Sequence, residues 1–144
     1  PEAFDRILVD APCTGLGALR RRPEARWRKS PADVAELVPL QVGLLTAAVD
    51  ALAPGGVVAY VTCSPHLAET TAVVEEVRRI RPELVELDAR AVLHGVAQSP
   101  IDLADDGRAQ TGSAQLWPHR HGTDAMFLAL LQRPLEATDA PKEG

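Results

Sequence analysis

The hydrophobic pattern of the first 62 residues predicts two short buried strands separated by a long helix. Residues 4–10 form an apolar run that stops at an aspartate, and residues 57–62 form a β-branched and aromatic run that stops before a cysteine. Such runs, bounded by Gly and Pro, are typical of buried strands. The order strand, helix, strand predicts a right-handed parallel crossover in an α/β fold.

The intervening helix has a recognisable start. Ser30 is expected to be its N-cap, with Pro31 at the first helical position and Asp33 at the third. From Leu40 onward, apolar residues recur at three- and four-residue spacing, and residues 53–56 are expected to end the helix. We therefore expect one apolar face to pack on a sheet, formed by Leu44, Leu45, Ala48, Val49 and Leu52.

The second half of the chain predicts further elements of the same kind. Residues 68–80 predict a helix whose inward positions are Ala72, Val73, Val77 and Ile80. We expect a short strand at 84–87, a long surface excursion at 89–113 and a last apolar strand at 125–131. From Pro134 onward we expect a frayed tail.

Both cysteines of the chain directly follow a predicted strand. Asp10 ends the first strand and Cys13 lies in the next turn, whereas Cys63 follows the second strand. Because ligands bind at the carboxyl ends of parallel strands, we expect both thiols at one cleft. The alternative is that both are small buried hydrophobic residues. Two cysteines without secretory features indicate a reduced, cytoplasmic setting.

The charge of the 144 residues is unevenly distributed. The formal net charge is −5, but residues 1–30 carry +3 and the remainder carries −8. Most of this positive charge lies in one basic cluster at residues 20–29, so a polyanion is expected to bind beside the cleft. The alternative is that the cluster is a solvated loop without a partner. Trp27 is expected to cover the edge of the core, with stacking on a base as the alternative. The basic cluster comprises Arg20, Arg21, Arg22, Arg26, Arg28 and Lys29.

Metals, membranes and nucleotide phosphates are not expected as partners. His94, His119 and His121 lack the spacing of zinc ligands relative to the cysteines, so we predict no metal site. The uninterrupted apolar runs are far shorter than the roughly 18 residues that span a bilayer, so we predict no membrane association. A phosphate-binding loop and a dinucleotide fingerprint are also absent from the sequence.

Several motifs together carry a family resemblance that extends over about residues 4–132. The chain resembles the catalytic half of the Sun/Fmu type of RNA 5-methylcytosine methyltransferases. The resemblance includes two short motifs, at 117–120 and 122–124, that directly precede the final predicted strand. The two cysteine motifs, with Pro-Gly-Gly between them, are the most specific part. The matching segments are Asp10-Ala11-Pro12-Cys13-Thr14-Gly15, Ala53-Pro54-Gly55-Gly56, Tyr60-Val61-Thr62-Cys63-Ser64, Trp117-Pro118-His119-Arg120 and Gly122-Thr123-Asp124.

The resemblance implies methylation of carbon 5 of cytosine in RNA, with ribosomal RNA as the usual target and S-adenosylmethionine as the methyl donor. It implies that Cys63 attacks carbon 6 of the base, which makes carbon 5 nucleophilic. Cys13 would assist release of the product, and Asp10 would pair with N3 and the amine of the base. Asp10 and Pro12 would contact the methionine end of the cofactor. We also expect Cys63 to be the more readily alkylated cysteine.

The same resemblance implies a partial domain. Residues 1–133 would form the C-terminal half of a Rossmann-like class I methyltransferase sheet, in which parallel strands are joined by an antiparallel final strand and helices cover both faces. Residues 134–144 would be a flexible tail. The main cofactor loop would lie upstream, so we expect the chain alone to be inactive. The strand at 4–10 would be an exposed edge and is expected to promote self-association.

Two alternative functions remain open at this point. A non-catalytic RNA-binding or scaffold module would keep the fold without the activity. A DNA cytosine-5 methyltransferase also uses a Pro-Cys motif, but it would make Cys13 the nucleophile and would not require Thr62 and Cys63.

Overall fold

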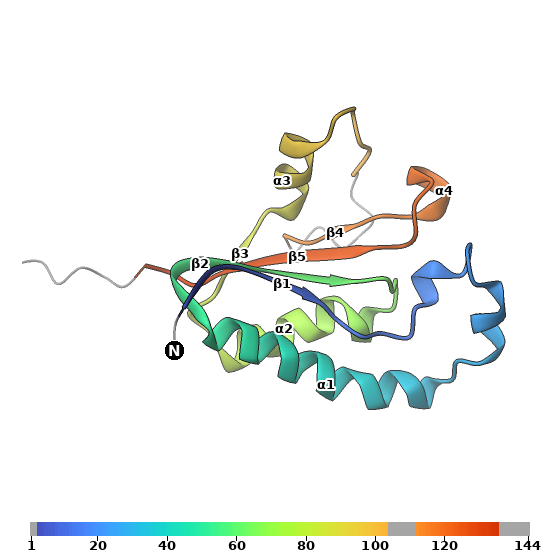
Figure 1. Cartoon of the computed structure of the whole chain (residues 1–144), viewed down its shortest axis with the longest axis horizontal. Helices are drawn as coiled ribbons and strands as arrows, with labels where there is room; N and C mark the ends of the chain where they lie inside the picture. Colours follow the sequence, from blue (N-terminus) through green and yellow to red (C-terminus); the bar gives the residue numbers. More distant parts are fainter. Residues whose placement is uncertain (1–2, 104–111, 136–144) are drawn as a thin grey trace, which may run out of the picture.

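A five-stranded mixed sheet organises the computed structural model, which describes residues 3–103 and 112–135 (Figure 1). The strand order is β1-β2-β5-β3, with β4 paired to β5. β1 and β2 are parallel. β5 runs antiparallel to each of its partners β2, β3 and β4. The strands are β1 (Phe4–Asp10), β2 (Leu52–Thr62), β3 (Val85–Leu87), β4 (Ala114–Gln115) and β5 (Phe127–Gln132).

The helices cover both faces of this sheet, as the sequence predicts (Figure 1). α1 (Pro31–Asp50) and α2 (Thr71–Ile80) pack together beneath it, and α3 (Ala89–Val96) lies on the opposite face. Short helical turns η1 (Leu16–Ala18) and η2 (Pro23–Trp27) follow β1, and η3 (Leu67–Glu69) precedes α2. A last short helix, α4 (Pro118–His121), lies before β5.

The predicted start of α1 is confirmed in detail. Asp33 accepts hydrogen bonds from the backbone N–H and the hydroxyl of Ser30, which completes a capping box. The second strand, in contrast, begins earlier than predicted. Residues 53–56 lie within β2 and interrupt its register with β1, because Phe4 pairs with Leu52 whereas Arg6 pairs with Val57. The Pro-Gly-Gly segment therefore forms an irregularity inside a strand and does not precede it.

The buried face of α1 differs from the predicted one. Leu45 and Val49 are buried as expected, but Leu40 and Leu44 are 50% and 39% exposed. The buried stripe instead runs through Val34 and Gln41, at helical spacing from Leu45 and Val49. The polar Gln41 occupies a core position because it takes part in a buried hydrogen-bond network. Leu52 belongs to β2.

α1 is relevant to the prediction that the chain does not associate with a membrane. By length and composition, this 20-residue helix is long and apolar enough to cross a bilayer, a property that core helices of soluble proteins share. In the structure it packs against α2 and the sheet, and it buries Gln41, Leu45 and Val49 there. Because Leu40 and Leu44 remain exposed, packing in the core accounts for only part of its apolar composition.

Two further sequence interpretations need correction. The region after Asp88 is not purely a loop, because α3 begins at Ala89 and Asp88 caps it by accepting hydrogen bonds from two backbone N–H groups. In α2 the buried positions are Val73, Val74 and Val77, whereas Ala72 and Ile80 are exposed. The predicted excursion and tail extend into residues 104–111 and 136–144, which lie outside the described residues.

Candidate active site

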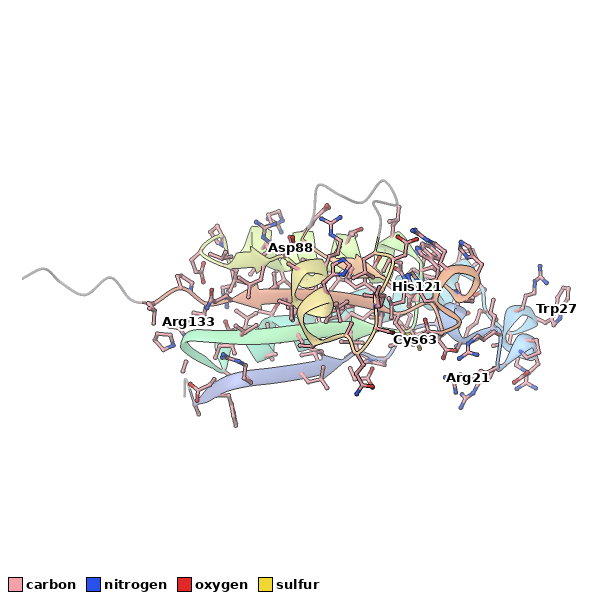
Figure 2. All side chains as sticks on the ribbon, turned by 90° about the horizontal axis from the view of Figure 1, so that it is seen from above. Arg21, Trp27, Cys63, Asp88, His121 and Arg133 are labelled. Carbon is pink, nitrogen blue, oxygen red and sulfur yellow. The ribbon has the colours of Figure 1, made fainter. Side chains whose placement is uncertain are left out.

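The two cysteines lie where β1 and β2 end side by side. Asp10 is paired with Val61 across the parallel strands, so Cys13 and Cys63 follow at the same edge of the sheet. Their Sγ atoms are 3.5 Å apart, and both side chains are partly exposed. Figure 2 shows Cys63 toward the end of the sheet from which the loop with Arg21 extends. The fold thus brings together two sulfur atoms that are 50 positions apart in the sequence.

A cavity of about 560 Å³ opens at these strand ends. It is lined by Asp10, Pro12, both cysteines and Arg21, among other residues. Its volume lies within the range of about 300–1,000 Å³ that is usual for small-ligand sites. An acid, two thiols and a cation therefore face one space. The remaining lining residues are Ala11, Thr14, Gly15, Ala18, Arg22, Ala25 and Lys29.

A buried carboxylate that the sequence interpretation did not single out supports this cavity from beneath. Glu69 is fully buried. It accepts hydrogen bonds from the N–H and hydroxyl of Thr14 (2.8 and 2.6 Å) and from the hydroxyl of Ser64 (2.6 Å). Gln41 donates to it at 3.3 Å and to the carbonyl of Pro12 at 2.9 Å. The only local signal is an acid that follows two apolar residues, Leu67 and Ala68, just before a helix.

The protonation states of the buried groups follow from these contacts. Burial raises the pKa of Cys13, and the charge and hydrogen bond of Cys63 and the charge of Glu69 add to this effect, bringing it to about 12 despite the opposing backbone contact of Gly15. Burial also disfavours the charged form of Glu69. The hydrogen bonds from Ser64, Thr14 and Gln41 outweigh this, so the pKa of Glu69 lies below its ordinary value. At neutral pH, Cys13 is a thiol and Glu69 is an anion.

The loop after β1 is held against the loop after β2 by a glycine. Gly17 donates its N–H to the carbonyl of Cys63 and accepts a hydrogen bond from the N–H of Ala125, both at 2.9 Å. A Cβ atom at Gly17 would lie 2.2 Å from the Ala125 oxygen and 2.7 Å from the Cys63 oxygen. The absence of a side chain therefore permits the close approach of three backbone segments.

Two residues of the basic cluster are engaged by an acid. Arg20 donates to Asp124 at 2.8 Å, and Arg21 forms a bidentate pair with the same carboxylate. These contacts lower the pKa of Asp124, which is 8% exposed. Both arginines remain largely accessible, with side chains 45% and 59% exposed. Asp124 thereby orients the start of the basic cluster beside the cavity.

The rest of the cluster lies on the surface of the same loop. Arg22, Arg28 and Lys29 are exposed and form no ion pair within residues 3–103 and 112–135. The expectation that Trp27 covers the core edge is wrong, because this side chain is 83% exposed. It projects beyond the body of the protein (Figure 2), and Arg26 lies over its ring at 5.6 Å from the centroid. A freely projecting indole beside cations suits stacking on a planar ligand.

The histidines take part in local contacts. His121 accepts a hydrogen bond from the Trp117 N–H through Nδ1 at 2.8 Å, and its Nε2 contacts the Asp102 carbonyl at 2.6 Å. His119 lies against the Trp117 ring. In the described part of the chain, no three His, Cys, Asp or Glu side chains are grouped as metal ligands.

The fold and this site define a class of protein. Solved structures that resemble the chain include a Pyrococcus horikoshii NSun6 with SFG, an S-adenosylmethionine analogue, with a TM-score of 0.70 and 27% identity over 91% of this chain and 30% of that one. Another is PH0851, with a TM-score of 0.75 and 34% identity over 90% of this chain and 27% of that one. The chain has the fold of the class I methyltransferases.

The family follows from the sequence match. The model of the family described as 16S rRNA methyltransferase RsmB/F matches residues 1–132, and the chain belongs to this family. A Mycobacterium tuberculosis protein named only as a methyltransferase is 58% identical over 130 residues, which cover 90% of this chain and 26% of that protein. The ribosomal RNA small subunit methyltransferase F of Pectobacterium carotovorum is 32% identical over 100% of this chain and 28% of its own length. The chain spans about a quarter of these relatives.

Proposed function

We propose that this chain carries the thiol pair of an S-adenosylmethionine-dependent methyltransferase that modifies carbon 5 of cytosine in RNA. The observation that carries the proposal is the 3.5 Å separation of the Cys13 and Cys63 sulfur atoms in a cavity that Asp10 also lines. The names of the relatives support ribosomal RNA of the small subunit as the substrate. Free thiols at such a site suit the reducing cytoplasm, which we infer as the location.

The protonation of Cys13 separates the roles of the two sulfurs. Burial and the neighbouring Cys63 raise the pKa of Cys13 well above that of a free thiol, so Cys13 is predominantly a thiol at pH 7. Because the thiolate is the nucleophile, we assign the attack on carbon 6 of the base to Cys63. This assignment disfavours the DNA-type alternative, in which Cys13 would attack.

Asp10 and Pro12 complete the reacting centre in this proposal. The Asp10 carboxyl is assigned to N3 and the exocyclic amine, where a shared proton eases addition of sulfur to the ring. S-adenosylmethionine would supply the methyl group, and Asp10 and Pro12, which line the cavity, would hold its methionine end, since the acid can pair with an ammonium group. Contacts to the rest of the cofactor are assigned to residues outside this chain.

Cys13 is assigned to the release step. Once Cys63 is joined to carbon 6, its sulfur is a neutral thioether that neither repels a second thiolate nor accepts its proton. The charge of Cys63 and its hydrogen bond to Cys13, which both raise the pKa of Cys13, are then removed. Cys13 therefore becomes a better acid and is more readily ionised. As a thiolate it takes the proton from carbon 5, the electrons of that bond re-form the 5,6 double bond, and the carbon 6–sulfur bond breaks with Cys63 leaving as a thiolate.

The basic loop is assigned to the RNA backbone. The target base must leave its stack to reach the thiols, and this is least costly in single-stranded or looped RNA. Arg20, Arg21, Arg22, Arg26, Arg28 and Lys29 would hold the flanking phosphates, and Trp27 would stack on a neighbouring base.

The decisive experiment traps the adduct on RNA that contains 5-fluorocytosine, because fluorine at carbon 5 cannot leave as a proton does. In the intact protein, we expect peptide mapping to find the RNA on Cys63. Cys13→Ala should accumulate a covalent complex on unmodified RNA, whereas Cys63→Ala should form none. An adduct on Cys13 would overturn the assignment. A scaffold function predicts that Cys63→Ala changes neither RNA affinity nor methylation.

A further inference from the structure

Glu69 is unusual because it is a buried anion without a buried counter-charge. Its side chain is fully buried, and within residues 3–103 and 112–135 no cationic group forms an ion pair with it. Three short hydrogen bonds from Thr14 and Ser64, and a longer one from Gln41, satisfy the carboxylate. Burying a charge disfavours folding unless its lone pairs are satisfied, so the groups that donate to Glu69 are held to it tightly.

The hydroxyl donors to Glu69 come from the two loops that carry the cysteines. Thr14 directly follows Cys13, and Ser64 directly follows Cys63. Both hydroxyls donate to the same oxygen, Glu69 Oε2, at 2.6 Å. One atom therefore links the loop after β1 to the loop after β2, one residue beyond each sulfur.

Further contacts fix the carboxylate itself. The Tyr60 hydroxyl donates to the Glu69 backbone carbonyl at 2.9 Å, which ties the residue to β2. Gln41 connects it to α1 and also to the carbonyl of Pro12, next to Cys13. The loops that carry both thiols are thus held from one rigid centre formed by β2, α1 and η3.

We infer that Glu69 is a positioning residue for the thiol pair: by binding Thr14 and Ser64 it holds the Cys13 and Cys63 sulfurs in contact and facing one cavity. This inference rests on the proposed function for its catalytic meaning, but its geometric content concerns the protein alone. Loss of the carboxylate releases Thr14 and Ser64, the residues next to the two thiols, so the two sulfurs cease to be held in contact while each thiol remains reachable.

The test measures thiol geometry without RNA or cofactor. Dibromobimane becomes fluorescent when it bridges two thiols, and a monofunctional bimane reports the reactivity of single thiols. For Glu69→Ala we expect bridging of Cys13 and Cys63 to slow at least tenfold relative to wild type, with single-thiol labelling within about twofold. Glu69→Gln keeps the shape and lets the two hydroxyls rotate to accept its N–H groups, so it should restore bridging to within about threefold.

Control variants separate positioning from general stability. Val77→Ala removes fully buried apolar contacts on α2 and leaves every donor to Glu69 in place. It should lower the melting temperature and preserve bridging. Equal loss of bridging in Val77→Ala would overturn the inference. If Glu69→Ala does not fold, Thr14→Val and Ser64→Ala each remove one hydroxyl donor and should each slow bridging.

The outcomes also distinguish this inference from the proposed function. Unchanged bridging in Glu69→Ala, or in both donor variants, overturns the positioning role whatever the RNA experiment gives. Slowed bridging supports that role even where wild-type protein forms no adduct with 5-fluorocytosine RNA, a result that would overturn only the cytosine chemistry. In the intact enzyme, Glu69→Ala should lower kcat at least tenfold with KM for RNA within about twofold, because the ion pairs of Arg20 and Arg21 with Asp124 still hold the basic cluster.

Discussion

Gly17 donates its backbone N–H to the carbonyl of Cys63 at 2.9 Å, which fastens the loop after β1 directly to the residue that follows β2. The spacing leaves no room for a methyl group, because a Cβ atom would lie 2.7 Å from the Cys63 oxygen and nearer still to that of Ala125.

Gly17→Ala is therefore expected to destabilise the protein by about 1–3 kcal/mol, since the clashing atoms are backbone and cannot rotate away. Urea denaturation measures the change. Gly43→Ala is the matched control, because Gly43 lies in α1 and nothing lies within 4 Å of an added Cβ atom. That variant should gain about 0.5–1 kcal/mol from helix propensity. Equal effects of the two substitutions would contradict the packing argument.

Alkylation should distinguish the two thiols by pH. Because burial and Cys63 raise the pKa of Cys13 to about 12, iodoacetamide at pH 7–8 should label Cys63 first, and Cys13 labelling should keep rising to about pH 12. Peptide mass spectrometry follows both sites. Cys63→Ser removes the neighbouring thiolate and should make Cys13 react at lower pH. Labelling of Cys13 alone at pH 7 would contradict the assignment.

The buried Glu69 predicts a loss of stability in acid. Its pKa is lowered in the folded state, so the unfolded chain binds a proton more readily as the pH falls. The stabilisation is complete above the ordinary value of 4.5 and is lost as the pH falls through the folded pKa. Glu69→Gln should have a flatter stability profile in this window, measured by urea midpoints at successive pH values. Parallel profiles for the two proteins would refute the idea that Glu69 is ionised in the fold.

The sequence was sufficient to predict the parts of the fold whose ends are marked by local residues such as Pro, Gly and N-cap residues. Asp10 and Pro12 mark the end of β1, Cys63 and Pro65 mark the end of β2, and Ser30 marks the start of α1. Since parallel neighbours end at one edge, the juxtaposition of the two thiols followed from strand ends alone.

Features that depend on distant partners escaped prediction. Glu69 is a core residue only because Thr14, 55 positions away, folds over it, and a local pattern contains no trace of that contact. Gln41 is buried on α1, where the predicted face was purely apolar, because its side chain completes the same network. α3 was hidden by Gly95 and by its short length, and its Asp88 cap became evident only in the structure.

Charge reversal in the basic loop tests RNA binding. Arg28→Glu and Lys29→Glu alter exposed side chains without breaking the Asp124 pairs, so they should weaken RNA binding and reduce the salt slope by about 0.7 for each lost phosphate contact on single strands. Filter binding at several salt concentrations measures both quantities. Arg79→Glu, on α2, is the control and should leave the slope unchanged. Unaltered binding in both loop variants would retire the assignment of this loop to RNA.

The final prediction concerns the edge of the sheet. Among the described strands, β1 pairs only with β2, and its Phe4 and Leu8 side chains are 56% and 69% exposed. An unpaired apolar edge tends to pair with another chain, so we propose that this 144-residue chain self-associates through residues 4–10 when purified alone. Light scattering over a range of concentrations should give a mass above that of the monomer.

Leu8→Lys should shift that equilibrium toward the monomer, because a charge on an edge strand opposes pairing. Leu67→Lys is the control, since Leu67 is 55% exposed on η3, which packs against α1 and α2, and its substitution should leave association unchanged. A wild-type monomer at every concentration, with β1 amides protected from hydrogen exchange, would show that the edge is stable unpaired and would refute the prediction.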